Sequence, residues 1–291
     1  MSFSRRHILS VGATGLAAAM ATAPKSLAQT QQPVAPAITV NLQGASADKV
    51  VLITGATSGI GKTTAEAFAS QGAKVFFCGR RENLGAQVEQ GIRAMGGEAT
   101  YRRADVRNAR EMQAFVEACV AKYGRLDIAF NNAGIDYPPA PTADTKVEEF
   151  DDLMNTNARG VFLGMKYEIP HLLKTGKGVI INMASIGGQR AFPNIIGYGA
   201  SKAAVIHMTK MAAQEYGTLR INAVSPGTIN TPMLDRVKRD WQVTEEQLVA
   251  PYPMQRVGQA SEVANLVLWL ASDAASYISG GQFSVDGGGL G

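Results

Sequence analysis

Cysteine and histidine are scarce in this chain of 291 residues. The two cysteines, Cys78 and Cys119, are too few for a disulfide scaffold or for a cysteine-based zinc site. The three histidines are His7, His171 and His207, and none stands in an arrangement that suggests a Ser–His–Asp triad. We therefore expect no metal site, and the chemistry of the chain must come from other side chains.

Charge of one sign and long apolar runs are also lacking. Residues 1–28 hold Arg5, Arg6 and Lys25 and no acidic residue, and the remainder holds 25 basic and 24 acidic side chains. That balance gives no reason to expect a nucleic-acid partner. No mid-chain apolar run is long and clean enough for a stable membrane span. Hydrophobic residues still make up 46% of the chain, which supports a full core and excludes a disordered protein.

Residues 1–28 have the organisation of an export signal. Arg5-Arg6 precede an uncharged stretch rich in Ala and Gly, and Ser26-Leu27-Ala28 offers the small residues that a signal peptidase reads. The segment resembles a twin-arginine signal and predicts a periplasmic or otherwise exported protein. The alternative is a cytosolic extension with a chance Arg-Arg pair, and thus a cytoplasmic protein.

Beyond a polar, Pro-containing linker at residues 29–48, short apolar runs alternate with helical patterns. The continuous apolar run at 50–53 predicts a strand that is buried on both faces, and further strands are expected at 75–78, 99–103, 126–130, 179–183, 219–224 and 282–285. Helices are expected at 62–71, 82–95, 108–123, 147–173, 198–216 and 261–271. Strict alternation predicts a doubly wound, Rossmann-type parallel sheet. Since we find no internal repeat and no second core, we expect one α/β domain over residues 49–291.

A glycine-rich turn, Thr54-Gly55-Ala56-Thr57-Ser58-Gly59-Ile60-Gly61, separates the first predicted strand from the first helix. Gly55 permits the tight turn, Gly59 lets a pyrophosphate approach the backbone, and Gly61 lets the helix pack close to the strand. The helix N-terminus adds free N–H groups and the positive end of its dipole. We therefore expect the following residues to bind the phosphates of a dinucleotide: Gly55, Thr57, Ser58, Gly59, Ile60 and Gly61.

Four further motifs follow later strands in order. They are Asn131-Asn132-Ala133-Gly134, Ser185, Tyr198-x3-Lys202 and Pro226-Gly227. With these motifs and the turn, residues 49–288 resemble the compact, single-domain branch of the short-chain dehydrogenase/reductase family. The resemblance implies an NAD(P)-dependent oxidoreductase that transfers a hydride between a nicotinamide cofactor and a secondary alcohol/ketone substrate. It also implies a homotetramer or homodimer, formed through the helices expected at 147–173 and 198–216.

Tyr198 is expected to be the general acid/base. Lys202 lies one helical turn further on the same face, and a nearby ammonium should lower the pKa of the phenol from its ordinary value of about 10. By the resemblance, Ser185 holds the substrate oxygen and Asn157 holds a water that relays protons to the lysine. Asn155 is the local competitor for that role.

The resemblance also assigns the remaining cofactor contacts. Asp105 and Val106 match the position that contacts adenine. Asn132 and Ala133 are expected beside the adenosine ribose, with Gly134 next to them, whereas Asn131 supports the strands. The segment over the nicotinamide corresponds to Pro226, Gly227, Ile229 and Thr231. Tyr198 and Lys202 complete the cofactor site, Lys202 through the nicotinamide ribose.

Cofactor choice is predicted from the end of the second strand. Gly79 stands where NAD-selective enzymes of this kind usually place Asp, and Arg80-Arg81 follow it. The planar fork of Arg80 suits a 2′-phosphate. Arg81 either assists or pairs with Glu82. We predict that NADP(H) is preferred and keep NAD(H) as the alternative.

Residues 228–258 are interpreted as a mobile lid. Its Met233, Leu234, Trp241 and Tyr252, together with Phe192 and the loop 136–139, suggest an apolar substrate pocket. The alternative for each aromatic side chain is that it only packs the lid against the domain. Two other functions compete with hydride transfer. A dehydratase or epimerase on the same scaffold fits the single-domain size less well. A non-catalytic nucleotide-binding sensor or scaffold would be expected to lose one or more of the four catalytic residues, and all four are present.

Overall fold

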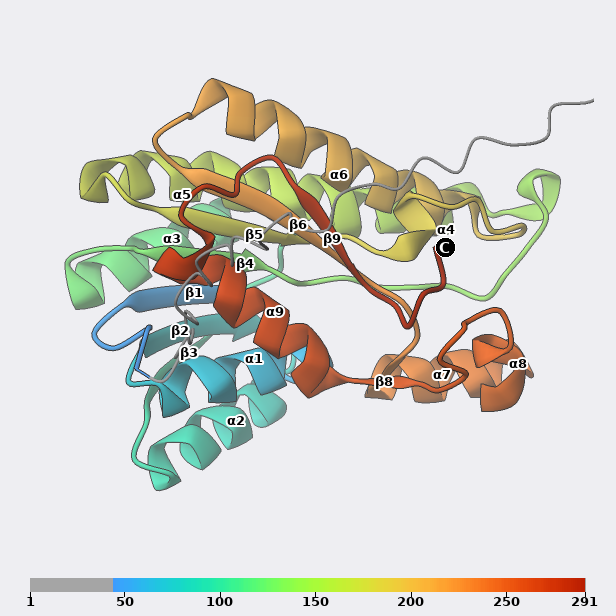
Figure 1. The fold of residues 1–291 in the computed structure, drawn as a ribbon, viewed down its shortest axis with the longest axis horizontal. Coiled ribbons are helices and arrows are strands. Elements are labelled where there is room, and N and C mark those ends of the chain that lie inside the picture. Colours follow the sequence, from blue (N-terminus) through green and yellow to red (C-terminus); the bar gives the residue numbers. More distant parts are fainter. Residues whose placement is uncertain (1–43, 291) are drawn as a thin grey trace, which may run out of the picture. The chain divides into compact units, whose positions relative to one another are not determined.

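A seven-stranded parallel sheet lies at the centre of the computed structural model, which describes residues 44–290 (Figure 1). The strand order is β3-β2-β1-β4-β5-β6-β9. The strands are β1 (Val50–Thr54), β2 (Lys74–Gly79), β3 (Glu98–Arg103), β4 (Ile128–Asn131), β5 (Val179–Met183), β6 (Arg220–Pro226) and β9 (Gln282–Val285). This is the doubly wound α/β domain that the alternation predicts. The predicted export signal and most of the predicted linker lie outside the described residues.

Helices cover both faces of the sheet (Figure 1). One face is covered by α1 (Gly59–Ser70), α2 (Glu82–Ala94) and α9 (Ala260–Ala271), and the other by α3 (Ala109–Tyr123), α5 (Gly160–Thr175) and α6 (Ile196–Glu215). Strands β1, β2, β4 and β5 are buried on both sides for this reason, which explains their apolar runs, whereas the edge strands β3 and β9 are partly exposed. In the part of the chain that the structure describes, no helix is long and apolar enough to cross a bilayer.

Successive side chains of the central strands serve two separate cores. Val51 and Ile53 of β1 pack with the α1 and α9 side, whereas Val50 and Leu52 pack with the α3, α5 and α6 side. This follows from the two-residue period of a strand. Each core therefore fixes the register of β1, and with it the position of the turn that follows Thr54.

The chain reverses its direction of travel across the sheet beside β1. From β1 the chain moves outward to β2 and β3, and it then returns to place β4 on the opposite side of β1. The carboxyl ends of β1 and β4 therefore feed loops that diverge. In open α/β sheets, the crevice at such a point is where ligands bind.

The single helix expected at 147–173 is instead three consecutive pieces. They are α4 (Val147–Leu153), a π-helical turn (Met154–Arg159) and α5. The wider turn contains Asn157, whose side chain bonds the backbone of Ile135 in the loop after β4. This tertiary contact holds the π-helical turn in place. Turns of this kind are frequent at functional sites.

The segment interpreted as a lid carries regular structure of its own. Two short strands, β7 (Ile229–Asn230) and β8 (Gly258–Gln259), pair at its two ends. Between them lie α7 (Pro232–Asp240) and α8 (Glu245–Val249), which extend to one side of the sheet in Figure 1. The pairing of β7 with β8 ties the base of this segment, and its mobility stays a prediction.

Candidate active site

A cavity of about 710 Å³ opens at the carboxyl ends of the central strands. Every residue predicted to bind the cofactor lines it: Gly55, Thr57, Ser58, Gly59, Ile60, Gly61, Arg80, Arg81, Asp105, Val106, Asn132, Ala133, Gly134, Tyr198, Lys202, Pro226, Gly227, Ile229 and Thr231. Ser185 lines it as well. Residues far apart in the sequence therefore share one space, with the glycine-rich turn as part of its wall.

The glycine-rich turn is held by side chains on both strands that flank it. Asn132 Nδ2 donates to the carbonyl oxygens of Thr54 and Gly55 at 3.0 and 3.1 Å. Thr54 Oγ1 accepts from the backbone N–H groups of Asn132 and Ala133 at 3.0 and 3.1 Å. Asn132 thus fastens the turn. This structural role is separate from the place beside the adenosine ribose that the resemblance implies for it.

Gly55 cannot be replaced by a larger residue without moving the backbone. Its φ is +70°, and an added Cβ would lie 2.6 Å from Ala133 Cα. The turn therefore passes directly against the end of β4 with bare backbone, which leaves its N–H groups free for an anion at the N-terminus of α1. This cradle fits the pyrophosphate of a dinucleotide.

The end of β2 places two arginines beside that turn. Arg81 Nη2 donates to Thr57 Oγ1 at 2.8 Å and to Ser58 Oγ at 2.6 Å. Burial lowers the pKa of Arg81, and the charges of Arg236 and Arg80 lower it further. The sequence left open whether Arg81 assists Arg80 or pairs with Glu82. Among the residues that the structure describes, the Arg81–Glu82 pair is not formed, and Glu82 Oε1 lies 3.7 Å from Arg103 Nε instead.

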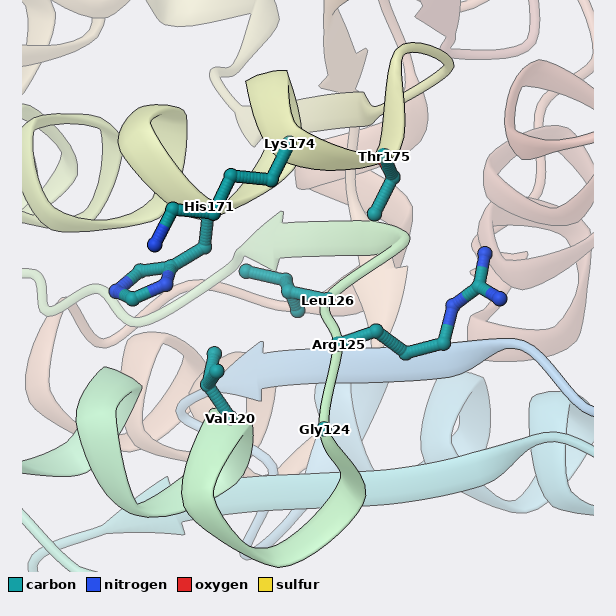
Figure 2. Close-up of a pocket in the computed structure, with 7 residues that line it drawn as sticks. All are labelled: Val120, Gly124, Arg125, Leu126, His171, Lys174 and Thr175. Atoms are coloured by element: carbon teal, nitrogen blue, oxygen red, sulfur yellow. The ribbon is translucent and has the colours of Figure 1, made fainter.

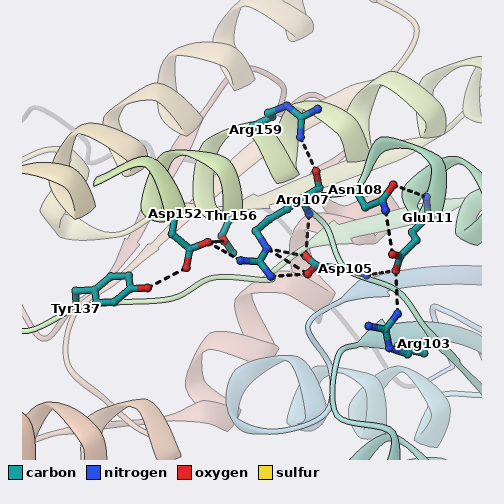
Figure 3. Close-up of polar contacts among 9 residues, drawn as sticks. All are labelled: Arg103, Asp105, Arg107, Asn108, Glu111, Tyr137, Asp152, Thr156 and Arg159. Carbon is teal, nitrogen blue, oxygen red and sulfur yellow. Dashed lines mark hydrogen bonds and ion pairs between the residues drawn. The ribbon is translucent and has the colours of Figure 1, made fainter. Parts of the chain in front are cut away.

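The acidic residue after β3 is engaged by an arginine that the sequence analysis missed. Arg107 contacts both carboxylate oxygens of Asp105, with Nη2 to Oδ2 at 2.7 Å and Nε to Oδ1 at 3.1 Å (Figure 3). Burial raises the pKa of Asp105, but the hydrogen bonds and charge of Arg107 outweigh it and hold the pKa below its ordinary value. Asp105 therefore faces the cavity as a clamped carboxylate. Its position two residues before an arginine was the only sequence signal.

Tyr198 and Lys202 project from α6 toward β5. Lys202 is buried, and its Nζ donates to the carbonyl oxygen of Met183 at 2.9 Å while lying 5.8 Å from the centroid of the Tyr198 ring. Burial lowers the pKa of Lys202 to about 8. The same burial raises the pKa of Tyr198, against a hydrogen bond with Ser185 that lowers it. In the protein alone the pKa of the phenol is therefore raised, against the lowering that the sequence analysis expects.

Ser185 lies at the carboxyl end of β5, beside Tyr198. Its Oγ accepts from the backbone N–H of Gly187 at 3.1 Å, as the cap of a short 3-10 turn at Ile186–Gly188. A Cβ on Gly187 would lie 3.3 Å from the Tyr198 ring and 3.5 Å from Ser185 Oγ, so both groups lie close to the bare backbone of this glycine. The serine and tyrosine hydroxyls thus face one region of the cavity, where a carbonyl oxygen can meet both.

Asn157 is fully buried behind the cavity wall. Its Oδ1 accepts from the Ile135 N–H at 2.8 Å, and its Nδ2 donates to the Ile135 carbonyl oxygen and to Ser201 Oγ. A Cβ on Gly134 would lie 3.3 Å from Asn157 Oδ1 and 3.5 Å from Lys202 Nζ, so both side chains lie close to that glycine. Asn155, its competitor, is exposed on the same π-helical turn.

Asn131 supports the strands, in the role expected for it. Its Nδ2 donates to Asn182 Oδ1 at 3.1 Å on the neighbouring strand and to Glu168 Oε2 at 2.9 Å on α5. Glu168 is fully buried, and this burial raises its pKa to about 8. The sequence gives no signal for this acid, since it stands in an otherwise apolar stretch of helix.

The lid contributes apolar side chains to the cavity, although fewer than expected. Met233, Leu234 and Trp241 line it. Tyr252 instead packs with Phe192 in a small core beneath α7 and α8, and its hydroxyl lies 3.0 Å from Thr228 Oγ1. The expectation that Tyr252 and Phe192 line the pocket is therefore wrong, because the lid needs them to bury its own inner face.

A second cavity of about 410 Å³ lies near the amino-terminal end of β4 (Figure 2). His171 of α5 points toward Val120 of α3 there, while Arg125 extends away and pairs with Asp127 at 2.6 Å. None of the predicted catalytic or cofactor residues lines this cavity. His171 thus lines a cavity that is separate from the one that holds the predicted site residues.

The comparisons with known proteins agree with this geometry. A family described as Enoyl-(Acyl carrier protein) reductase matches residues 55–289. Cyclohexanol dehydrogenase of Acinetobacter sp. (strain SE19) is 41% identical over 242 residues, which are 82% of this chain and 94% of that protein. The crystal structure of levodione reductase superimposes with a TM-score of 0.81 at 36% identity, covering 83% of this chain and 97% of the other. The structure titled "ElxO with NADP Bound" gives a TM-score of 0.79 at 34% identity, with 84% and 99% covered.

The chain belongs to the short-chain dehydrogenase/reductase family. It is an oxidoreductase of the kind that acts on CH–OH and C=O groups with a nicotinamide cofactor, as the resemblance implies.

Proposed function

We propose that this enzyme interconverts a compact secondary alcohol and its ketone, with NADP(H) as the preferred cofactor and Tyr198 as the general acid/base. The observation that carries the proposal is the meeting of Ser185, Tyr198 and Lys202 in the same cavity as the glycine-rich turn. The nicotinamide, when bound, supplies or accepts the hydride. The residues of the chain must therefore bind the substrate oxygen and move one proton.

Ser185 and Tyr198 are suited to those two tasks. Both hydroxyls can hydrogen-bond one carbonyl oxygen, and the Tyr198 O–H can donate its proton as that oxygen becomes an alkoxide. Burial raises the pKa of Tyr198, so the phenol is protonated at neutral pH, which is the form needed to donate to a ketone. Lys202 is charged below about pH 8 and stabilises negative charge on the phenolate oxygen left behind.

The preference for NADP(H) is supported by the end of β2. A side chain at position 79 would meet Thr57 Cγ2 at 2.5 Å, so the site favours glycine over an Asp that would repel a 2′-phosphate. Arg80 lines the cavity with an exposed side chain, and Arg81 already bridges Thr57 and Ser58. Two guanidinium groups beside the cradle suit a phosphate, and the similar ElxO was solved with NADP bound.

The substrate class is supported by the lid and by the names of two relatives. Met233, Leu234 and Trp241 give the cavity an apolar end suited to a small alicyclic ring. The similar proteins are named for cyclohexanol and for levodione. We test the proposal by following NADPH absorbance with cyclohexanone, cyclohexanol, a 3-oxoacyl thioester and an enoyl thioester. Turnover of the cyclic pair supports it, and turnover of the enoyl thioester alone would contradict it.

Assembly and location complete the proposal. Phe162 of α5 and Met211 of α6 are large apolar side chains that are 48% and 52% exposed, and a homodimer or homotetramer formed through these helices would cover them.

The Arg5-Arg6 segment supports export by a route that carries folded proteins, so the cofactor can travel already bound.

A further inference from the structure

One arginine outside the cavity connects its two ends. Arg107 lies between Asp105, which follows β3, and Asp152 of α4 (Figure 3). Its Nη2 donates to Asp105 Oδ2 and its Nη1 to Asp152 Oδ1, both at 2.7 Å. Arg159 Nη1 donates to the Arg107 carbonyl oxygen at 2.5 Å and so fixes the backbone from which the guanidinium extends.

The second oxygen of Asp152 is used by a residue of the cavity wall. Tyr137 OH donates to Asp152 Oδ2 at 3.0 Å. Tyr137 stands in the loop after β4, directly beside Asp136, whose charge raises the pKa of Tyr198. The hydrogen bonds thus link Asp105, Arg107, Asp152 and Tyr137 in one chain, which we call the relay. Asp105, Asp152 and Tyr137 all line the cavity, so the relay runs from the adenine end of the cavity to its catalytic end.

The relay has a net negative charge, because Arg107 neutralises only one of its two carboxylates. One guanidinium faces two carboxylates, and each carboxylate is kept ionised because Arg107 outweighs the burial that would raise its pKa. Without Arg107, Asp105 and Asp152 would stand as uncompensated, half-buried anions. Asp152 would then be free to turn toward water, and Tyr137 would lose its acceptor.

The loop is also held at a second point. Thr156 Oγ1 donates to Asp152 Oδ1 at 3.4 Å from the π-helical turn, and the adjoining Asn157 bonds both backbone groups of Ile135. Ile135 and Tyr137 therefore have fixed anchors, one through backbone and one through the phenol. Because its hydroxyl is engaged by Asp152, Tyr137 can present only its ring to a substrate.

We propose that Arg107 is a positioning residue which, through Asp152, holds Tyr137 as the wall of the substrate end of the cavity. The inference rests on the proposed function only for the identity of the substrate. The relay itself belongs to the protein without any ligand, so it can be tested by a measurement that needs no turnover.

The variants are Tyr137→Phe, which removes only the hydroxyl, Asp152→Asn and Arg107→Gln. The matched control is Arg103→Gln, because Arg103 pairs with Glu111 at 3.2 Å and has no bond to Asp152. Thermal melts establish that each variant folds. Hydrogen exchange of the peptide 134–140 should accelerate in the three relay variants and not in the control. Unchanged exchange in all three would overturn the proposal whether or not a substrate is known.

Kinetics then separate positioning from general damage. Tyr137→Phe should raise the KM for the ketone about 3- to 10-fold, with kcat within about 2-fold; this is less than the full loss of a charge-assisted hydrogen bond, because the phenol bonds Asp152 and not the substrate. The Kd of NADPH should be unchanged in Tyr137→Phe and raised in Arg107→Gln, since Arg107, and not Tyr137, bonds the carboxylate of Asp105. Adding Tyr137→Phe to Arg107→Gln should raise KM no further. Additive effects in the double variant would contradict the relay.

Discussion

Lys202 and Met183 are joined by a 2.9 Å hydrogen bond from the ammonium to the backbone carbonyl oxygen at the end of β5. The lysine is thereby held on the sheet, with its charge 5.8 Å from the Tyr198 ring rather than on the phenol oxygen. Its charge can still act on a phenolate at that distance in a buried site. The bond also fixes where the ammonium can reach, because a buried side chain with a satisfied donor has little freedom.

Replacing Tyr198 by Phe should abolish turnover while cofactor binding persists. Only the hydroxyl can move the proton, and the ring can still pack on α6. Loss of a positioned acid/base costs about 100- to 10,000-fold in rate. Steady-state rates and NADPH fluorescence titration measure the two effects, and activity within a few-fold of the wild type would refute the assignment.

The rate of ketone reduction should fall as the pH rises through about 8. Burial lowers the pKa of Lys202 to about 8, so its charged form is present below that pH and lost above it. The phenol stays protonated over the same range, because its pKa is raised. The measurement is kcat/KM against pH. In Lys202→Arg, whatever activity is left should keep a flat profile to higher pH, since a guanidinium stays charged; a wild-type profile flat from pH 7 to 9.5 would contradict this assignment.

Glu168→Gln should stabilise the protein at alkaline pH and have little effect at pH 5. The folded-state pKa of about 8 lies above the unfolded value, so the folded protein binds the extra proton between these values and wild-type stability is lost progressively as pH rises from about 4.5 to 8. A permanently neutral amide avoids that loss, which for a shift from 4.5 to about 8 is on the order of 5 kcal/mol. Urea unfolding at pH 5 and 8.5 measures it, with exposed Glu117→Gln as the control; equal effects of Glu168→Gln at both pH values would argue against a buried proton.

Arg80→Ala should weaken NADP(H) binding about 10- to 100-fold and leave NAD(H) nearly unchanged, the scale of a charge-assisted hydrogen bond. Arg81→Ala should impair both cofactors, because it also releases Thr57 and Ser58 of the shared phosphate turn. Titration of both cofactors into each variant decides the matter. Equal losses in Arg80→Ala, or tighter NAD(H) binding by the wild type, would overturn the preference.

The mature protein should begin near Gln29 and be recovered outside the cytoplasm. The expectation follows from Arg5-Arg6, the uncharged stretch and Ser26-Leu27-Ala28. N-terminal sequencing of protein from fractionated cells tests it, with Arg5→Lys/Arg6→Lys as the matched variant that should remain unprocessed. An intact N-terminus in the cytoplasm of wild-type cells refutes it.

Much of the fold could be predicted from the sequence, because the local sequence pattern of the strands and turns agrees with their packing in the folded domain. The unbroken apolar run at Val50–Ile53 is buried on both faces, and the glycine-rich turn falls between β1 and α1 as expected. The π-helical turn at Met154–Arg159 was not readable, since it depends on a bond from Asn157 to a loop 22 residues away. Arg107 escaped notice for the same reason: its partner Asp152 is 45 residues distant. The raised pKa of Tyr198 was not predicted because it comes chiefly from burial, which is a property of the folded site and is not visible in the sequence.

The close approach of Gly79 to Thr57 constrains how cofactor preference could change in evolution or by engineering. An acid introduced at position 79 must displace Thr57 Cγ2, and Thr57 is held in place by Arg81. A β-branched side chain with its hydroxyl engaged has no alternative rotamer at low cost. The two positions therefore form an epistatic pair: Gly79→Asp is disfavoured alone and becomes accessible only after Thr57 has been reduced in size. A lineage that acquires Asp at position 79 from this sequence must therefore change the phosphate turn first.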